Sequence, residues 1–325
     1  MAKVIRLHEY GGPERLLVEE MDPGAPAAGE VQVRHTAVGL NYIDVYDRTG
    51  LYPMDLPGVL GREAAGVITA VGRRVRGFKP GQRVAYVHST PGAYSELRNV
   101  PAERLVRIAP GISDIEAAAL MLKGLTAQYL LRRTYRVQRG DSILVHAAAG
   151  GVGLLLCQWA RALGARVIGV VGSDAKAELA RKNGCRHALI SGRDDIVASV
   201  KKLTRGLGVA VVYDSVGKDT FMESLDCLRP LGMMVSYGNA SGPPPPVSPI
   251  ELTKRGSLFL TRPTLFSYIP NREQLEAAAR ELFAVVKSRE VRVRVGQTYP
   301  LVEAAQAHAD LEARRTTGST VLIPS

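Results

Sequence analysis

The stretch "SILVHAAAGGVGLLLCQWARALG", residues 142–164, decides the fold class of this chain. It has the pattern of an apolar strand, a glycine-rich turn and a helix. In dinucleotide-binding proteins, glycines at such a turn let the backbone approach a pyrophosphate, which the helix N-terminus attracts through its free N–H groups and dipole. Ala148 occupies the first glycine position of that fingerprint. We predict that Gly150, Gly151 and Val152 bind a dinucleotide; a βα turn without a ligand is the alternative.

Strands and helices continue to alternate after this turn. The predicted strands cover 142–147, 166–172, 187–191, 209–217 and 232–238, and the predicted helices cover 151–164, 173–184, 194–206 and 218–232. Apolar strands that are each followed by a helix indicate a parallel sheet covered on both faces. A further strand candidate, "SLFLTRP" at 257–263, follows a proline-rich loop. The fold class is therefore α/β, with a doubly wound parallel sheet in this part of the chain.

The two ends of the chain have other patterns. Short β-branched runs at 3–10, 30–40, 64–72, 82–88 and 105–110 are separated by Gly and Pro, which predicts a compact, mostly-β unit before the α/β part. A helix is predicted over 113–135, with Ser113 as its N-cap and Glu116 as the capping-box partner. The C-terminal tail predicts two helices, 271–290 and 302–318, and a last strand, 319–324.

The residues after the second strand of the α/β part bear on the choice of nucleotide. Proteins that bind NAD place an acidic residue about 20 positions after the glycines, where it binds the ribose hydroxyls. Here that place holds Gly172 and Ser173. Ser173 can donate to a 2′-phosphate and Lys176 can neutralise it. Asp174 could repel a phosphate, but we interpret it as an outward-pointing residue at a helix start, where negative charge is favourable. The pattern favours NADPH, with NADH as the alternative.

Composition and cysteine usage bound the class of protein. A chain of 325 residues with 46% hydrophobic and 22% charged residues is long enough for two globular domains. No run approaches the roughly 18 apolar residues of a membrane span, and residues 1–14 contain no secretory signal, so we expect a cytoplasmic protein without membrane contact. Cys157, Cys185 and Cys227 lack metal-site spacing and are expected to be reduced.

The net charge of +11 raises the question of nucleic-acid binding. The basic residues are spread along the whole chain. The densest clusters, 72–79 and 312–318, are short, and Phe78 is the only aromatic residue in them. We therefore interpret the charge as a solvated basic surface, and binding to nucleic acid is not expected as a main role.

Several blocks resemble one known family. They are "AVGLNYIDVYDRTGLYP", "LPGVLGREAAGVITAVG", "MLKGLTAQYLLRRTY", "HAAAGGVGLLLCQWARALGA", "VVYDSVGKDT" and "ARRTTGSTVLIP". The chain resembles bacterial NADPH:quinone oxidoreductases, relatives of zeta-crystallin in the medium-chain dehydrogenase/reductase superfamily. The resemblance implies a GroES-like catalytic domain over 1–124 and 265–325, interrupted by a Rossmann NADPH-binding domain over 125–264, with the active site in the cleft between them.

The superfamily's catalytic zinc lacks its ligands here. A catalytic zinc needs three protein ligands, usually Cys, His or a carboxylate. The resemblance places Asn41 and Arg62 at two of the family's ligand positions, and a guanidinium has no lone pair for a metal. The six histidines form no HxH or HxxxH cluster. We predict a zinc-free reductase, because a quinone is a strong electrophile that needs little polarisation by a metal.

The resemblance also suggests the residues of the site. Asn41, Tyr46 and Tyr52 resemble residues that line the nicotinamide and substrate pocket, where Asn41 could hydrogen-bond a quinone oxygen or the ribose and Tyr52 could stack or donate a proton. Core packing is the alternative for both tyrosines. Further cofactor contacts carried over are Thr126, Tyr129, Ser191, Tyr237, Gly238 and Arg314. Ser191 stands where relatives often have a tyrosine, which puts affinity for the adenosine in question.

The expected reaction is hydride transfer from NADPH to a quinone, with no general acid identified. Reduction of α,β-unsaturated carbonyls is the alternative, since the same donor and zinc-free pocket would serve. A less favoured alternative is binding of AU-rich RNA, reported for relatives of zeta-crystallin. The resemblance also implies a homodimer, in which the short apolar strand 257–261 pairs at the edge of the Rossmann sheet with its copy.

Overall fold

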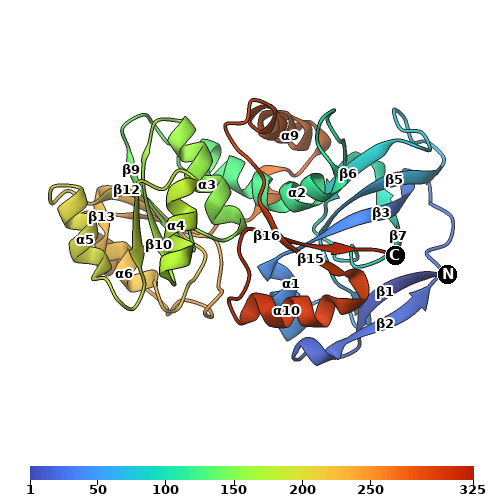
Figure 1. The fold of residues 1–325 in the computed structure, drawn as a ribbon, viewed down its shortest axis with the longest axis horizontal. Helices are drawn as coiled ribbons and strands as arrows, with labels where there is room; N and C mark the ends of the chain where they lie inside the picture. The colour runs from blue at the N-terminus through green and yellow to red at the C-terminus, as the bar shows by residue number, and fades with distance from the viewer. The chain divides into compact units, whose positions relative to one another are not determined.

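The structure is a computed structural model that describes all 325 residues. The chain divides into two compact units (Figure 1). The first unit contains Met1–Leu125, Ile269–Phe283 and Val293–Ser325, and the second contains Thr126–Tyr268 and Ala284–Arg292. Both units are therefore built from segments that are distant in sequence.

The breaks near residues 125 and 268 lie close to the boundaries predicted from the sequence. Residues 284–292 differ, because the prediction placed them in the catalytic domain and they pack with the second unit. Gln158 gives the physical reason. Its side-chain nitrogen donates to the carbonyl of Arg292 at 3.1 Å, and its side-chain oxygen accepts from the Arg292 N–H at 2.8 Å.

The second unit is built on a six-stranded parallel sheet. Its strands are β9 (Ser142–His146), β10 (Arg166–Val171), β11 (His187–Ile190), β12 (Val209–Asp214), β13 (Leu228–Ser236) and β14 (Phe259–Thr261). They lie in the order β11-β10-β9-β12-β13-β14. Helices α3 (Gly151–Ala162), α4 (Asp174–Lys182), α5 (Ile196–Leu203) and α6 (Phe221–Asp226) connect the first five strands. Since the order reverses between β9 and β12, this is the doubly wound α/β architecture that the sequence predicted.

For one helix of the second unit, the predicted length is wrong. The sequence predicted a helix over 218–232, but α6 ends at Asp226 and β13 begins at Leu228. Pro230 cannot continue a helix, because it lacks an N–H and its ring clashes with the preceding turn. Leu231 has a φ of 59°, and Leu228 pairs with Val209 across a bulge, so the strand begins earlier than its apolar run.

The first unit contains two sheets made largely of antiparallel pairs. Its strands are β1 (Ala2–Leu7), β2 (Leu16–Met21), β3 (Glu30–Leu40), β4 (Gly58–Val59), β5 (Glu63–Val71), β6 (Arg83–Val87), β7 (Leu97–Pro101), β8 (Leu105–Arg107), β15 (Val295–Pro300) and β16 (Ser319–Ile323). The larger sheet has the order β15-β16-β3-β5-β6-β8, with β7 also paired to β3, and the smaller has the order β2-β1-β4. The red C-terminal strand β16 lies beside the blue strand β3 in Figure 1, so the last residues complete a sheet begun by the first.

The remaining helices are short apart from two. They are α1 (Tyr42–Thr49), α2 (Asp114–Tyr129), α7 (Ile250–Lys254), α8 (Leu265–Tyr268), α9 (Arg272–Lys287) and α10 (Ala304–Glu312), with 3-10 turns at Pro13–Arg15, Ala102–Arg104 and Leu301–Glu303 and a π-helical turn at Leu130–Thr134. The predicted capping box of α2 is confirmed, because Ser113 and Glu116 exchange hydrogen bonds of 2.9 and 3.2 Å. None of these helices combines the length and apolarity needed to cross a membrane.

Candidate functional site

The glycine-rich turn forms an open backbone cradle at the start of α3. Gly150 is the N-cap, with extended backbone, and no side chain caps the helix. The N–H groups of Gly151 and Val152, at the first turn of the helix, therefore have no intrahelical acceptor. A Cβ on Gly153 would lie 2.2 Å from the carbonyl oxygen of Ala147, so only glycine fits there. Uncapped N–H groups at a helix N-terminus are suited to an anion such as a pyrophosphate.

The adjacent turn, between β10 and α4, carries the residues predicted to read the nucleotide. Ser173 caps α4, and its hydroxyl oxygen accepts from the backbone N–H of Lys176 at 3.4 Å. Asp174, the acid that opposed NADPH in the sequence, pairs with Arg193, whose Nη1 lies 3.0 Å from both carboxylate oxygens. Arg193 follows β11, the strand beside β10. The carboxylate of Asp174 therefore has a cationic partner within the protein, in an exposed ion pair.

Sequence reasoning missed Arg193. A signal was available, because a basic residue two positions after Ser191 stands at the end of the neighbouring parallel strand. The carboxyl ends of neighbouring parallel strands meet at one edge of a sheet, where ligands bind in open α/β folds. The backbone N–H of Ser191 donates to the carbonyl of Val171 at 2.9 Å, which places Ser191 at the same edge.

Tyr237 and Gly238 lie on the other side of the point where the strand order reverses. The N–H of Tyr237 donates to the carbonyl of Asp214, the last residue of β12, at 2.7 Å. A Cβ on Gly238 would lie 2.5 Å from the carbonyl oxygen of Ser215, so the two loops approach as closely as backbone allows. Gly150, Ser173, Ser191, Tyr237 and Gly238 thus all follow the carboxyl ends of strands of this sheet.

Thr126 and Tyr129 lie on the last turns of α2, where both are buried. The Tyr129 ring stacks on Tyr268 with centroids 4.4 Å apart and an interplanar angle of 12°. Burial, followed by the neighbouring phenols of Tyr237 and Tyr268, raises the pKa of Tyr129. Arg133 covers the Tyr268 ring at 5.1 Å. Tyr129 therefore stays protonated and is held as part of an aromatic stack that the sequence did not reveal.

In the first unit, the structure brings Asn41, Tyr46 and Tyr52 together around α1. Asn41 is the N-cap of this helix, and its backbone N–H donates to Asp44 at 2.8 Å. The rings of Tyr46 and Tyr52 meet edge to face with centroids 5.2 Å apart, and the Tyr52 N–H donates to the Tyr46 carbonyl at 3.1 Å. Edge-to-face contact is the preferred arrangement of such rings. Arg314, also in this unit, follows α10 with a φ of 58°.

The amide of Asn41 is fixed by a buried carboxylate. Its Nδ2 donates to Oε1 of Glu63 at 2.7 Å and more weakly to the Gly39 carbonyl at 3.4 Å. Lys123 donates to the same Glu63 oxygen at 3.2 Å, and the Leu122 N–H donates to the other at 2.6 Å. Since Glu63 accepts only, the orientation of the amide is determined. The side chain of Asn41 also accepts from the backbone N–H of Asp44 in the capping box of α1, so any further partner would have to donate to the second lone pair of the amide oxygen.

An ion pair occupies the position where the superfamily has its second zinc ligand. Arg62 donates two hydrogen bonds to the carboxylate of Asp47, at 2.9 and 2.7 Å, and one to the carbonyl of Ser89. The Asp47 side chain is fully buried and that of Arg62 is 11% exposed. Burial, and next the charge of Asp47, raise the pKa of nearby Asp44 to about 7. No group of three or more His, Cys, Asp or Glu side chains could hold a metal ion. The residues present therefore do not fit a zinc site.

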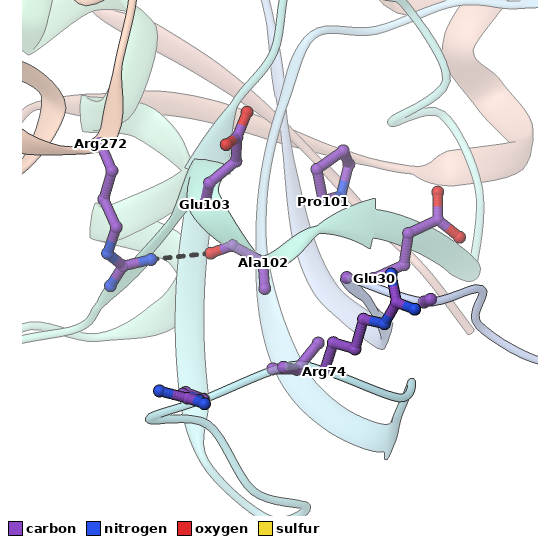
Figure 2. Close-up of a pocket in the computed structure, with 10 residues that line it drawn as sticks. Glu30, Arg74, Pro101, Ala102, Glu103 and Arg272 are labelled. Atoms are coloured by element: carbon purple, nitrogen blue, oxygen red, sulfur yellow. Dashed lines mark hydrogen bonds between the residues drawn. The ribbon is translucent and has the colours of Figure 1, made fainter.

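A surface hollow of about 670 Å³ lies elsewhere on the first unit (Figure 2). It is lined by Ala28, Gly29, Glu30, Arg74, Val75, Arg76, Pro101, Ala102, Glu103 and Arg272. Arg272 donates to the carbonyl of Ala102 at 2.9 Å. The basic cluster 72–79 contributes two arginines, but two glutamates share the hollow, so its charge is mixed. None of the predicted site residues lines it.

The fold of the two units, together with the glycine-rich turn of the second unit and the residues around α1 in the first, defines a class of protein. A GroES-like β unit joined to a doubly wound unit with a glycine-rich turn is the architecture of the medium-chain dehydrogenases and reductases. Residues 27–110 match the family model "Alcohol dehydrogenase GroES-like domain", and residues 151–284 match "Zinc-binding dehydrogenase".

Individual relatives narrow the class. A quinone oxidoreductase of Pseudomonas aeruginosa is 52% identical over the full length of both chains. A 2-haloacrylate reductase of a Burkholderia species is 47% identical and covers 100% of this chain and 99% of its own. The crystal structure of Escherichia coli quinone oxidoreductase complexed with NADPH has a TM-score of 0.98 and 48% identity, and covers 99% of this chain and 100% of its own. The chain therefore belongs to the quinone oxidoreductase family.

Proposed function

We propose that this protein transfers a hydride from NADPH to a quinone. The observation that carries the proposal is the uncapped glycine-rich turn at a sheet edge that also presents Ser173, Lys176 and Arg193. The E. coli relative that was solved with NADPH supports the choice of cofactor. The ion pair of Asp174 with Arg193 offsets the one feature of the sequence that opposed a 2′-phosphate.

The protein's contribution on the cofactor side is binding and orientation. The N–H groups of Gly151 and Val152 would hold the pyrophosphate, and the Ser173 hydroxyl with Lys176 and Arg193 would hold the 2′-phosphate. NADPH, when bound, supplies the hydride. Thr126, Tyr129, Tyr237, Gly238, Ser191 and Arg314 are the remaining proposed contacts of the cofactor.

On the substrate side, Asn41 can be assigned one of its two expected roles. Its N–H groups are engaged by Glu63 and Gly39, so the amide presents an acceptor. An acceptor can receive a ribose hydroxyl but cannot donate to a quinone oxygen. We therefore assign Asn41 to the ribose, and Tyr46 and Tyr52 to the quinone, against which their paired rings would form an apolar wall.

The reaction is proposed to be independent of zinc, because the ligand positions hold Asn41 and the Arg62–Asp47 ion pair. Positioning an electrophilic quinone against the donor supplies much of the rate without a Lewis acid. Metal analysis of the purified protein should find far less than one zinc per chain, and activity should persist in a chelator. One tightly bound zinc per chain would contradict the proposal.

Reduction of α,β-unsaturated carbonyls is a second candidate, supported by the 2-haloacrylate reductase among the relatives. A steady-state screen of NADPH oxidation against quinones and enones separates the two. We expect kcat/KM for simple quinones to exceed that for enones and haloacrylates by at least about tenfold, a difference of roughly 1.4 kcal/mol in transition-state binding. The reverse order would assign the enone reductase activity instead.

We also propose a homodimer formed through β14. This strand lies at the edge of the sheet, and Phe259 and Leu260 are 57% and 41% exposed. An apolar edge strand invites pairing with another chain, and a two-fold axis would join two copies antiparallel. Light scattering should give about twice 35.0 kDa. Leu260→Lys, which adds charge to the edge without touching the core, should shift the protein toward the monomer. A wild-type monomer would refute the assignment.

A cytoplasmic location fits the cysteines, which are all buried and free. Reduced thiols persist in the cytoplasm and are rare in secreted proteins. RNA binding is the least favoured role; retention of an AU-rich RNA in a gel, with and without NADPH, would detect it.

A further inference from the structure

Tyr94 lies where several segments of the first unit meet. It is fully buried in the loop between β6 and β7. Its backbone N–H donates to the carbonyl of Leu60 at 2.8 Å. A Cβ on Gly61 would lie 2.2 Å from a ring carbon of Tyr94, and Gly61 has a φ of 87°, so only glycine fits against the ring. The ring therefore packs on the chain that leads directly into Arg62 and Glu63.

The hydroxyl of Tyr94 lies between side chains from α1 and α10. It is 3.0 Å from Oδ2 of Asp44 and 3.0 Å from Nε2 of His308. Nδ1 of His308 lies 3.2 Å from Nη1 of Arg48, and because a guanidinium only donates, Nδ1 accepts. Burial, and next the charge of Arg48, lower the pKa of His308 to about 3, so the ring is neutral and carries its proton on Nε2. His308 therefore donates to Tyr94, and Tyr94 donates to Asp44.

Arg48 is held by partners other than His308. Its side chain is almost completely buried. Its Nε donates to the carbonyl of Gly11 at 3.0 Å, and its Nη2 donates to Oε1 of Glu312 at 2.8 Å. These bonds keep the guanidinium against His308, so the hydrogen bonds run in one direction, toward Asp44.

Asp44 connects the Tyr94 hydroxyl to Asn41, the N-cap of α1. Oδ2 of Asp44 accepts from the Asn41 N–H at 2.8 Å, and the Asn41 side chain accepts from the Asp44 N–H in the capping box. The other oxygen of the carboxyl group, Oδ1, is buried without a partner. The donors to Oδ2 therefore hold this group, and Tyr94 is one of them. The Asn41 amide is also held by Glu63, which follows the glycine that packs on the Tyr94 ring.

We propose that Tyr94 is a positioning residue for Asn41, whose amide oxygen binds the ribose of NADPH. The Tyr94 hydroxyl holds the carboxyl group of Asp44, and this group holds the backbone of Asn41 at the start of α1. The proposal rests on the proposed function, which assigns Asn41 to the ribose. Because a ribose contact is made in the ground state and in the transition state alike, displacement of Asn41 should raise KM for NADPH and leave kcat nearly unchanged.

The test compares the wild type with Tyr94→Phe, Asn41→Ser and the double variant. Tyr94→Phe keeps the ring against Gly61 and removes only the hydroxyl. Asn41→Ser keeps a capping hydroxyl at the start of α1 and removes the amide. Fluorescence titration should give an NADPH dissociation constant about three- to tenfold higher for Tyr94→Phe, the range expected for one neutral hydrogen bond, with kcat changed by less than about twofold.

The double variant separates a positioning role from an independent effect on the cofactor. If Tyr94 acts through the Asn41 amide, the double variant should bind NADPH as weakly as Asn41→Ser alone, whereas independent effects would multiply. Multiplied losses of affinity, or wild-type affinity in Tyr94→Phe, would overturn the proposal and leave the ribose contact of Asn41 in place. Unchanged affinity in Asn41→Ser would contradict that ribose contact and, with it, the role of Tyr94.

Tyr86→Phe is the matched control for loss of a buried hydroxyl. Tyr86 is also fully buried in the first unit, and its hydroxyl lies 3.0 Å from Nε2 of His35. Urea denaturation should show a loss of unfolding free energy in both Tyr86→Phe and Tyr94→Phe, but only Tyr94→Phe should bind NADPH more weakly. Equal losses of NADPH affinity in the two variants would indicate general destabilisation and would overturn the proposal.

Discussion

The two units prepare their candidate sites in opposite ways. In the first unit, Asn41 donates to Glu63 and Arg62 donates to Asp47, and all of these side chains except the partly exposed Arg62 are buried. In the second, the glycine-rich turn is uncapped and Ser173 and Arg193 are exposed. Buried charges that are already paired hold their side chains in one position before a ligand binds. Unpaired N–H groups at a helix N-terminus and exposed cations can instead bind an anion. Substitutions in the first unit should therefore affect folding, and those in the second should affect binding.

The largest effect is expected from breaking the buried ion pair. Asp47→Ala leaves the guanidinium of Arg62 without its bidentate partner in a buried place. Removal of one member of a buried pair typically costs about 3–5 kcal/mol, because the remaining charge is uncompensated. Urea denaturation monitored by circular dichroism measures the loss of unfolding free energy.

The control for this prediction is an exposed pair. Glu178 and Lys182 are one helical turn apart, with side chains 66% and 70% exposed. Glu178→Ala should change stability by less than about 1 kcal/mol, since exposed pairs contribute little. Equal losses of unfolding free energy in the two variants would contradict the view that the buried Arg62–Asp47 pair matters more to folding than an exposed pair.

The next effect concerns pH. Because the pKa of Asp44 is raised to about 7 in the folded protein, the folded state binds more protons than the unfolded state between pH 4 and 7. Stability contributed by this group is present at low pH and is lost as pH rises through that interval, by about 2–4 kcal/mol at most. Asp44→Asn should flatten this part of the stability profile. An unchanged slope in thermal unfolding at pH 5, 6 and 7 would rule out Asp44 as its source.

The contrast between the units also explains what could be predicted from the sequence. The α/β class and the glycine-rich turn were predictable because they depend on local patterns: apolar runs, a helix after a turn, glycines where backbone approaches backbone. Glu63, Asp47 and Lys123 were not, because their partners come from other elements and no spacing connects them. Arg193 could have been predicted only in part. Its partner Asp174 follows β10, whereas Arg193 follows β11, and the two meet because these strands are neighbours in the sheet.

A smaller effect should follow from changing the cations of the second unit. Lys176→Ala and Arg193→Ala should each raise KM for NADPH by about tenfold or more and leave KM for NADH nearly unchanged, because a charge-assisted hydrogen bond contributes roughly 1.5–3 kcal/mol. Arg193→Ala should have the larger effect, since it also exposes the phosphate to the charge of Asp174. Lys182→Ala, on the same helix as Lys176, is the matched control. Equal changes for both nucleotides would show that neither residue reads the 2′-phosphate.

The smallest effect is expected at Tyr52. Hydride addition to a quinone gives a hydroquinone anion, whose oxygen needs a hydrogen-bond donor or a proton. Asn41 cannot donate, because Glu63 engages its amide, which leaves the phenols of Tyr46 and Tyr52 as candidates in this group; Tyr46 is buried, so Tyr52 is tested first. Tyr52→Phe keeps the ring and its edge-to-face contact with Tyr46, so only the donor is lost.

We expect this substitution to lower kcat by less than about tenfold, below the 10²-fold or more typical of a general acid, because hydroquinone anions are weakly basic and solvent protonates them after release. Tyr299→Phe, which removes a phenol that donates to Asp310 at 2.6 Å, serves as the control for loss of a hydroxyl in the same unit. Stopped-flow measurement of NADPH oxidation gives kcat, and fluorescence titration gives NADPH affinity. If Tyr52→Phe removed most turnover and left that affinity intact, Tyr52 would be the proton donor, and the first unit would supply chemistry as well as geometry.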